Sequence, residues 1–190
     1  LSLGIAIAFP SPTLTSISQF FSFSTAESGL FNAITSLTAV AGPFFTNIFL
    51  NTRGRRFTIQ VTALLCALSW IVFIIIDENQ KYVAIFCRAL LGIAAGGFSA
   101  VNPVYIMELS PPEYRSIYGS MHQFGITVGI FLINLLGIYF EWRALSTISF
   151  LICLLLCVFI FFVPESPVFL KTFKNTFGTG SSQSSTDDHH

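Results

Sequence analysis

The chain has 190 residues, of which 53% are hydrophobic and only 9% charged, and its mean hydropathy is +0.75. A soluble domain carries about 25% charged residues, so this composition excludes an ordinary water-soluble fold. Nine Lys and Arg residues balance nine Asp and Glu residues, so no basic surface predicts a nucleic-acid partner. We therefore expect an integral membrane protein whose partner is the lipid bilayer.

Six apolar stretches are long enough to cross a bilayer core of about 30 Å, which takes about 20 helical residues. In chain order they cover residues 1–23, 29–50, 57–76, 82–107, 116–140 and 144–163. The third and sixth are nearly pure Leu, Ile, Val and Phe, whereas the others contain Gly, Ser, Thr, Asn and Pro, as is typical of helices that pack against protein or line a cavity. The sequence predicts an all-α membrane protein with six transmembrane helices.

Basic residues in the short loops set the orientation, because Lys and Arg accumulate on the cytoplasmic side of membranes. Six such residues fall on one side of the predicted spans, namely Arg53, Arg55, Arg56, Arg115, Lys171 and Lys174. The opposite loops hold only Lys81 and Arg143. We therefore expect a multi-pass protein with both ends in the cytoplasm.

The polar end of the chain differs from the rest. Residues 1–174 contain all six apolar spans, whereas residues 175–190 are rich in Ser, Gly and Thr and contain almost nothing apolar. Such a segment cannot bury enough surface to fold, so we expect a disordered cytoplasmic tail or a truncated linker. The four cysteines lie inside apolar runs without metal-ligand spacing, and we expect them to be packing residues, with no metal site and no cofactor.

The first span contains the run Phe9-Pro10-Ser11-Pro12. Proline removes a backbone donor and clashes with the preceding turn, so the run predicts a kink or break near the middle of the membrane. Broken helices are tolerated there where they line a cavity or are covered by neighbours. A kink can equally be architectural, so the run alone does not decide between these roles.

Arg88 is the only fixed charge well inside a predicted span, about six residues from Tyr82 and therefore about 9 Å along the helix axis. A charge at this depth needs a partner or water. One interpretation is an intramembrane cation on a gate or substrate path. The other is an arginine held by backbone carbonyls and interface water near the outer surface.

Polar and branched residues recur along one side of the fifth span. At intervals of three and four the span carries Gly119, Gln123, Ile126, Ile130, Asn134 and Gly137. Amides beside branched apolar groups suit a ligand with hydroxyls at its rim and apolar ring faces. Hydrogen bonding between helices, without a ligand, explains the same residues. No nucleophile–base pair, phosphate loop or zinc spacing occurs, so we do not expect an enzyme, and Gly96-Gly97 fits close helix packing.

Five short motifs in the loops and helix ends follow one another along the chain. They are NTRGRR at residues 51–56, a run from Arg88 to Arg115, HQFGI at 122–126, EWR at 141–143 and PESPVFL at 164–170. In this order they resemble the D-R-x-G-R-R loop, the R-x-x-x-G…P-x-Y-x-x-E…P…R run, the fifth helix, the loop five–six and the P-E-S-P-R-x-L signature of one transporter family. That family is the sugar-porter branch of the major facilitator superfamily, which includes the facilitative glucose transporters. The resemblance covers nearly the whole chain in matching order.

This resemblance implies the amino-terminal half of a twelve-helix carrier, built as a 3+3 inverted repeat, that moves a hexose or related sugar by alternating access. The missing carboxy-terminal half, or self-association, would cover its cavity face. It implies that Gln123 contacts sugar hydroxyls, that Ile126 and Ile130 flank the sugar, and that Phe9 and Ser11 contribute to the outer cavity. It also implies a cytoplasmic charge network for gating, formed by Arg53, Arg55, Arg56, Glu108, Arg115 and Glu165.

Departures from the family pattern refine these expectations. Asn51, Thr52 and Val168 replace residues that are charged in the family, which predicts a looser charge network. Pro10 stands where proton-coupled relatives carry an Asp, and no other carboxylate lies deep in a span. Facilitated diffusion, in the plasma membrane, is therefore favoured over a proton-coupled sugar symporter. The alternative class is a non-transporting sensor or an inert truncated membrane protein of the same fold.

Overall fold

The computed structural model describes residues 1–162 of the chain. Within them it contains eight α-helices, one short 3-10 helix and no β-strand, as expected for an all-α protein. In chain order these are α1 (Ser2–Ala8), α2 (Pro10–Phe20), α3 (Thr25–Ala39), α4 (Ala41–Arg53), α5 (Arg55–Ile75), α6 (Lys81–Leu109), η1 (Pro112–Tyr114), α7 (Arg115–Leu136) and α8 (Trp142–Phe159). Glu165, the boundary at residue 174 and the predicted tail at 175–190 lie outside the described residues.

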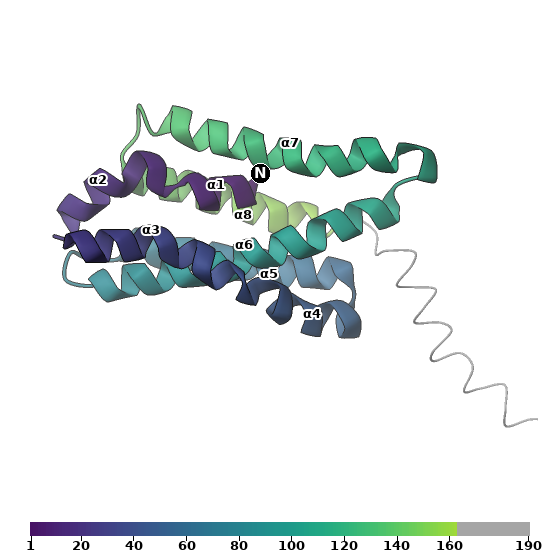
Figure 1. Ribbon diagram of the computed structural model, residues 1–190, viewed down its shortest axis with the longest axis horizontal. Helices are drawn as coiled ribbons and strands as arrows, with labels where there is room; N and C mark the ends of the chain where they lie inside the picture. The colour runs from purple at the N-terminus through teal and green to yellow at the C-terminus, as the bar shows by residue number, and fades with distance from the viewer. Residues whose placement is uncertain (163–190) are drawn as a thin grey trace, which may run out of the picture.

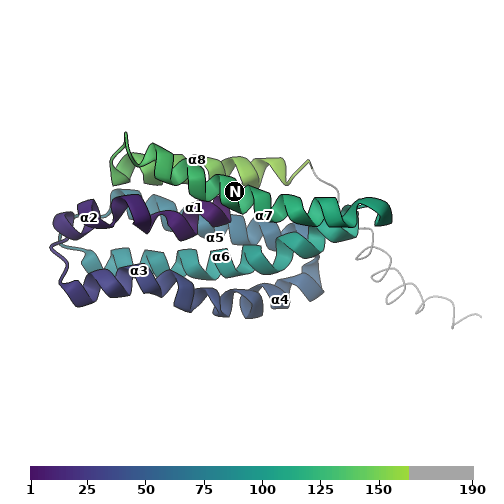
Figure 2. The same ribbon diagram turned by 45° about the horizontal axis from the view of Figure 1, so that its top comes forward.

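The helices form an elongated bundle whose long members run back and forth along a common axis (Figure 1). The α2–α3, α5–α6 and α7–α8 connections gather at one end, and the α4–α5 and α6–α7 connections gather at the other (Figure 2). We call the second end the basic end, because its two connections and the helix ends beside them hold Arg53, Arg55, Arg56 and Arg115. Four of the six basic residues that the sequence assigned to one side therefore lie at the same end, while Lys171 and Lys174 lie outside the described residues.

Five helical stretches in the described residues are long and apolar enough to cross a membrane. They are Thr25–Leu50, Arg55–Ile75, Lys81–Leu109, Pro112–Leu136 and Trp142–Phe159, which correspond to the second to sixth predicted spans. The first predicted span forms α1 and α2, neither of which is long enough alone. Together α1 and α2 form the first of the six predicted crossings.

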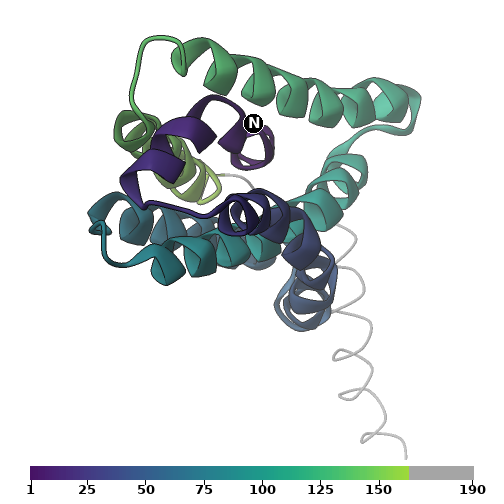
Figure 3. The same ribbon diagram turned by 60° about the vertical axis from the view of Figure 1, so that its left-hand side comes forward.

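The predicted break in the first span is present. α1 ends at Ala8, and α2 begins at Pro10, which occupies the first helical position where a missing N–H is tolerated. Phe9 keeps helical backbone angles between them, so the two short helices adjoin with a change of direction (Figure 3). The Thr13 hydroxyl, one turn further on, donates to the Phe9 carbonyl at 2.6 Å and helps to seat the first turn of α2.

A second bend, which the sequence analysis missed, separates α3 from α4 at Val40. Pro43 lies in the first turn of α4. A helix tolerates proline in its first turn, whereas proline in its interior would kink or break it. Gly42 lies against α6, since a Cβ atom on it would come within 2.5 Å of the Gly97 nitrogen. A Cβ on Gly96 would overlap the Ala39 carbonyl oxygen. The prediction that Gly96-Gly97 allows close helix packing is therefore confirmed.

The core lies where the first span meets α5, α6 and α8, and aromatic rings fill much of it. Phe9 packs edge-on against Trp70 with ring centroids 4.8 Å apart, and Phe73 packs edge-on against Trp142 at 5.7 Å. The Thr38 hydroxyl ties α3 to α6 by donating to the Ala89 carbonyl at 2.9 Å. All four cysteines are buried, in agreement with their predicted packing role. These contacts hold the first span, α3, α5, α6 and α8 together.

Candidate functional site

The α7 residues that the sequence singled out lie at the margin of the bundle. Gln123 is exposed, Ile130 is 37% exposed and Ile126 is half-buried. Of the 22 residues of α7, only Gly129 and Ile133 are buried, and Figure 3 shows the helix along one edge of the molecule. The three side chains are therefore accessible to a ligand or to another protein segment placed against this edge.

Two glycines bring α1 against α7 at the level of these residues. A Cβ atom on Gly4 would overlap the Ile126 carbonyl oxygen, and it would come within 3.1 Å of the Ile130 nitrogen. A Cβ on Gly129 would overlap the Leu1 carbonyl oxygen. The position of α1 therefore sets the position of the α7 turns that carry Ile126 and Ile130.

The two amides of α7 differ in their hydrogen bonding. The Asn134 side chain donates to the Ile130 carbonyl of its own helix at 2.8 Å. The Thr127 hydroxyl donates to the Gln123 carbonyl at 3.1 Å, but nothing in residues 1–162 hydrogen-bonds the Gln123 side-chain amide. Neither amide joins another helix within the part of the chain that the structure describes. Within residues 1–162, the Gln123 amide therefore does not bond one helix to another.

A groove of about 230 Å³ runs between α1, α3 and α6, and sequence reasoning did not find it. Its lining includes Ile7, Thr35, Ser36 and Ser99. The Ser99 hydroxyl donates to the Gly96 carbonyl at 2.8 Å, and the Thr35 hydroxyl donates across to the Arg88 carbonyl at 3.3 Å. Serines inside apolar spans were the signal available in the sequence, since polar groups that face lipid are costly.

The residues of the run Phe9 to Pro12 differ in burial, since Phe9 and Pro10 are buried and Pro12 is half-buried. Ser11 is exposed in the first turn of α2. The ring of Phe9 is completely buried against Trp70 and Phe73, so it lies in the core of the described bundle, and its contribution to a cavity stays a prediction. The Phe9 side chain packs on α5, whereas Ser11, two positions further along, faces another direction.

Arg88 lies inside the bundle at 1% exposure. Its Nη1 donates to the Ala6 carbonyl at 3.1 Å, and its guanidinium lies 5.4 Å from the ring centre of Phe31 and 5.8 Å from that of Phe9. Its Nε is buried and has no hydrogen-bond partner. No carboxylate of residues 1–162 pairs with it. A backbone carbonyl and two aromatic faces thus hold the guanidinium, and its role as a cation on a gate or substrate path stays a prediction.

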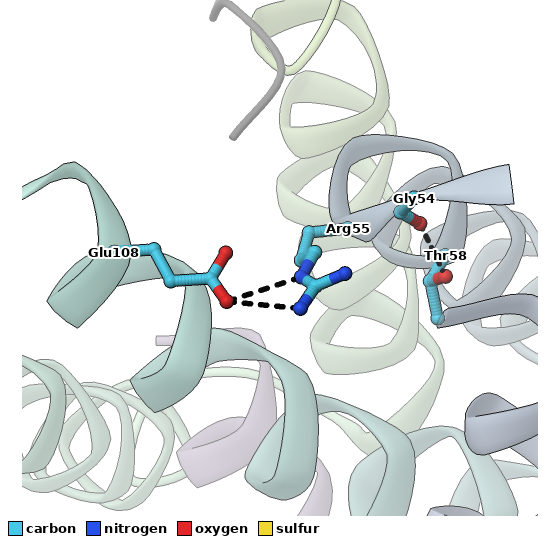
Figure 4. A network of polar contacts seen from close by, with 4 residues as sticks. All are labelled: Gly54, Arg55, Thr58 and Glu108. Atoms are coloured by element: carbon cyan, nitrogen blue, oxygen red, sulfur yellow. Dashed lines mark hydrogen bonds and ion pairs between the residues drawn. The ribbon is translucent and has the colours of Figure 1, made fainter. Parts of the chain in front are cut away.

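At the basic end, one ion pair joins the start of α5 to the end of α6 (Figure 4). Both Nε and Nη2 of Arg55 donate to one oxygen of Glu108, at 3.2 and 3.0 Å. Gly54 turns the chain from α4 into α5 at φ 90°, a conformation that favours glycine, and its carbonyl accepts from the Thr58 hydroxyl at 2.7 Å. The Gly54 turn therefore aims Arg55 at Glu108.

The other members of the expected charge network have different neighbours. Arg53 lies over the ring of Phe57 at 5.2 Å, and Arg56 Nη2 donates to the Phe161 carbonyl near the end of α8 at 2.6 Å. Arg115 begins α7 at an exposed position and makes no ion pair within residues 1–162, and Glu165 lies outside the described residues. Of the expected network, Arg55 and Glu108 therefore form an ion pair, while Arg53 contacts an aromatic ring and Arg56 a backbone carbonyl.

The opposite end carries an ion pair that sequence reasoning missed. Lys81 at the start of α6 contacts Glu27 at 2.5 Å. Glu27 also accepts from the Ser24 backbone nitrogen at 2.8 Å, while the Ser24 hydroxyl accepts from the Glu27 nitrogen at 3.3 Å. This capping box starts α3, and the spacing Ser24-x-x-Glu27 was the available signal. One carboxylate therefore both caps α3 and ties it to α6.

Comparison with known proteins identifies the family. The family described as Sugar (and other) transporter matches residues 6–182, and the chain belongs to it. Sugar transporter ERD6-like 6 of Arabidopsis thaliana is 30% identical over 171 residues, which cover 90% of this chain and 34% of that protein. Sugar transporter ERD6 of the same plant is 31% identical over 168 residues, with 88% and 33% covered. The chain spans about one third of the length of these curated relatives.

Solved structures share the fold. The major facilitator proton:xylose symporter XylE, bound to 6-bromo-6-deoxy-D-glucose, matches with a TM-score of 0.81 at 22% identity, covering 90% of this chain and 44% of that one. An inward open conformation of the xylose transporter XylE from E. coli matches with a TM-score of 0.79 at 22% identity, covering 93% and 49%. The predicted sugar-porter membership and major facilitator fold are confirmed, and this multi-pass membrane chain corresponds to the amino-terminal six-helix half.

Proposed function

We propose that this chain is the amino-terminal half of a twelve-helix carrier that moves a hexose or a related small sugar by facilitated diffusion. The sugar lies between this half and a second half, and the carrier opens alternately to the two sides of the membrane. Gln123 donates to and accepts from sugar hydroxyls, while Ile126 and Ile130 contact the apolar faces of the ring. Ser11 lies at the outer edge of the path.

The observation that carries this proposal is the unpaired amide of Gln123 on an exposed stretch of α7 beside Ile126 and Ile130. An amide that faces lipid without a partner is costly, so the position is better explained by a polar ligand or an aqueous path. An amide matches a hydroxyl because both groups donate and accept hydrogen bonds. The names of the relatives, which are sugar transporters, support the same class of ligand.

The surroundings of Arg88 support facilitated diffusion over proton symport. A backbone carbonyl and two aromatic rings contact the guanidinium, and none of them takes up or releases a proton at physiological pH. Pro10 stands where proton-coupled relatives carry a carboxylate. A proton carrier near Arg88 is therefore lacking within residues 1–162, whereas symport would require one.

Reconstituted vesicles that hold the protein as its gene encodes it test the proposal. We expect saturable uptake of labelled glucose or xylose down its gradient, with the same initial rate in acidic and neutral medium. A pH-sensitive dye inside the vesicles should record no proton entry with the sugar. Proton entry coupled to sugar would overturn facilitated diffusion in favour of symport. Saturable sugar binding without uptake would replace the carrier with a sensor.

We further infer that the basic end faces the cytoplasm of a cell whose plasma membrane holds the protein, so that both ends of this half are cytoplasmic. The support is the basic residues of the α4–α5 and α6–α7 connections, since such residues favour the cytoplasmic side. An impermeant thiol reagent added to intact cells should label a cysteine placed at Asn79 and leave one at Ser116 unlabelled. Labelling in the reverse pattern would invert this topology.

A further inference from the structure

The break in the first span leaves a carbonyl that needs a partner. In an α-helix the N–H of each residue donates to the carbonyl four residues earlier. Pro10 has no N–H, so the carbonyl of Ala6 loses the hydrogen bond that the helix would otherwise give it. Ala6 is buried at 2% exposure, where an unpaired carbonyl cannot be compensated by water.

The partner that the structure provides is Arg88. Its Nη1 donates to the Ala6 oxygen at 3.1 Å from a helix that is 82 residues further along the chain. The guanidinium is also enclosed by Phe9, which adjoins Pro10, and by Phe31 of α3. The cation thus occupies the place beside the break where the amide hydrogen of residue 10 is lacking.

We propose that Arg88 is a positioning residue that replaces the amide hydrogen missing at Pro10 and thereby fixes the direction of α1. Because Gly4 of α1 lies against the backbone of Ile126 and Ile130, the bond to Ala6 also fixes where those side chains stand. The role of Arg88 in transport rests on the proposed function. Its role in holding α1 against α6 does not.

The chemistry of this contact differs from that of an ion pair. The acceptor is a neutral carbonyl, so the bond persists across the pH range in which carboxylates and histidines change charge. No carboxylate of residues 1–162 pairs with the guanidinium, since the two described ion pairs are Arg55–Glu108 and Lys81–Glu27. The contact therefore couples the positions of α1 and α6 without coupling them to protons.

A matched control is present in the same run. Pro12 also lacks an N–H, and the carbonyl four residues before it belongs to Ala8, whereas the Arg88 hydrogen bond goes to Ala6. Pro10→Ala restores the hydrogen bond to the Ala6 carbonyl from within the helix, whereas Pro12→Ala restores only the bond to Ala8. If Arg88 acts by replacing the missing amide, Pro10→Ala alone should make Arg88 dispensable.

The experiment is a double-mutant cycle on the protein as its gene encodes it, with two readouts. Arg88→Met is combined separately with Pro10→Ala and with Pro12→Ala, and the thermal midpoint of the purified protein and the KM of sugar uptake are measured. Arg88→Met alone should lower the thermal midpoint and raise KM by about tenfold, as expected for a buried carbonyl that loses a charged donor. Arg88→Gln, which keeps an uncharged N–H donor, should lower the thermal midpoint less and raise KM less.

The proposal predicts that Pro10→Ala recovers most of the loss caused by Arg88→Met and that Pro12→Ala recovers none of it. Equal losses in the two proline backgrounds would overturn it, because Arg88 would then act through something other than the Ala6 carbonyl. If Arg88→Met yields no folded protein, the yields of the two double variants are compared in the same way. The thermal midpoint needs no sugar, so a chain that transports nothing would still decide the positioning role.

Discussion

α6 and α7 are both apolar enough to cross a membrane, yet they are buried to very different extents. In the most apolar stretch of α6, 56% of the residues are buried, against 11% in the most apolar stretch of the span Pro112–Leu136, which contains α7. Each carries a polar side chain at membrane depth. Arg88 of α6 has a carbonyl and two aromatic rings around it, whereas the Gln123 amide of α7 has no hydrogen-bond partner within residues 1–162.

The difference separates two uses of polarity inside a membrane. A polar group whose partners all lie in the same bundle contributes to the shape of that bundle, because its requirements are met there. A polar group on an exposed edge needs a partner from elsewhere. α6 therefore belongs to the fixed framework of this half, and α7 presents the surface on which the proposed ligand and second half would lie.

The largest effect on this contrast is expected where α7 is attached to the bundle. Gly4→Ala places a Cβ onto the Ile126 carbonyl, and because backbone atoms cannot yield easily, we expect a loss of about 3 kcal/mol in stability. The loss should exceed the gain of about 1 kcal/mol that alanine brings over glycine in a helix. Denaturant titration in a mild detergent would measure it.

Gly119→Ala is the control for this substitution. A Cβ at Gly119 meets nothing within 4 Å, so the same change there should leave stability equal or raise it through helix propensity. If both variants behaved alike, the close crossing of α1 and α7 would not be what holds α7 in place, and the contrast with α6 would lose its structural basis.

A smaller effect, confined to ligand binding, is expected from the two amides of α7. Gln123→Ala should weaken sugar binding by roughly 1 to 3 kcal/mol, because its amide is free to bond hydroxyls. Asn134→Ala is the matched change, and it should weaken binding much less because that amide is already bonded to the Ile130 carbonyl. Isothermal titration or equilibrium binding of labelled sugar would measure both. Equal losses would contradict this contrast, because an amide bonded within its own helix would then contribute as much to sugar binding as an unbonded one.

Much of the fold could be predicted because its signals are local. Span lengths gave six crossings, and the missing N–H of Pro10 gave the break in the first of them. The bend before Pro43 had the same kind of signal but was missed, since the apolar run continues through it. The capping box at Ser24 and Glu27 had an equally local signal. Lys81, which also binds Glu27, had no such signal because it is 54 residues away.

The site was less predictable because its partners carry no sequence pattern. A backbone carbonyl such as that of Ala6 has the same chemistry at every residue, so nothing in the sequence marks it as the acceptor for Arg88. The direction of a side chain beside a break is also set by packing, which is why Phe9 was expected at a cavity and lies in the core. Gln123 could be singled out because helical periodicity alone places it with Ile126 and Ile130, and its role in the site stays a prediction.

The order of these groups along the chain also bears on how the protein is made. Ala6, Phe9 and Phe31, which surround the guanidinium of Arg88, all precede α6 and are therefore synthesised before it. An arginine that entered lipid alone would be expensive to insert. The carbonyl and rings that contact Arg88 are already present in the nascent chain when α6 is made. Insertion of α6 can therefore coincide with its packing against the earlier helices, so that the guanidinium meets these partners as it enters the membrane.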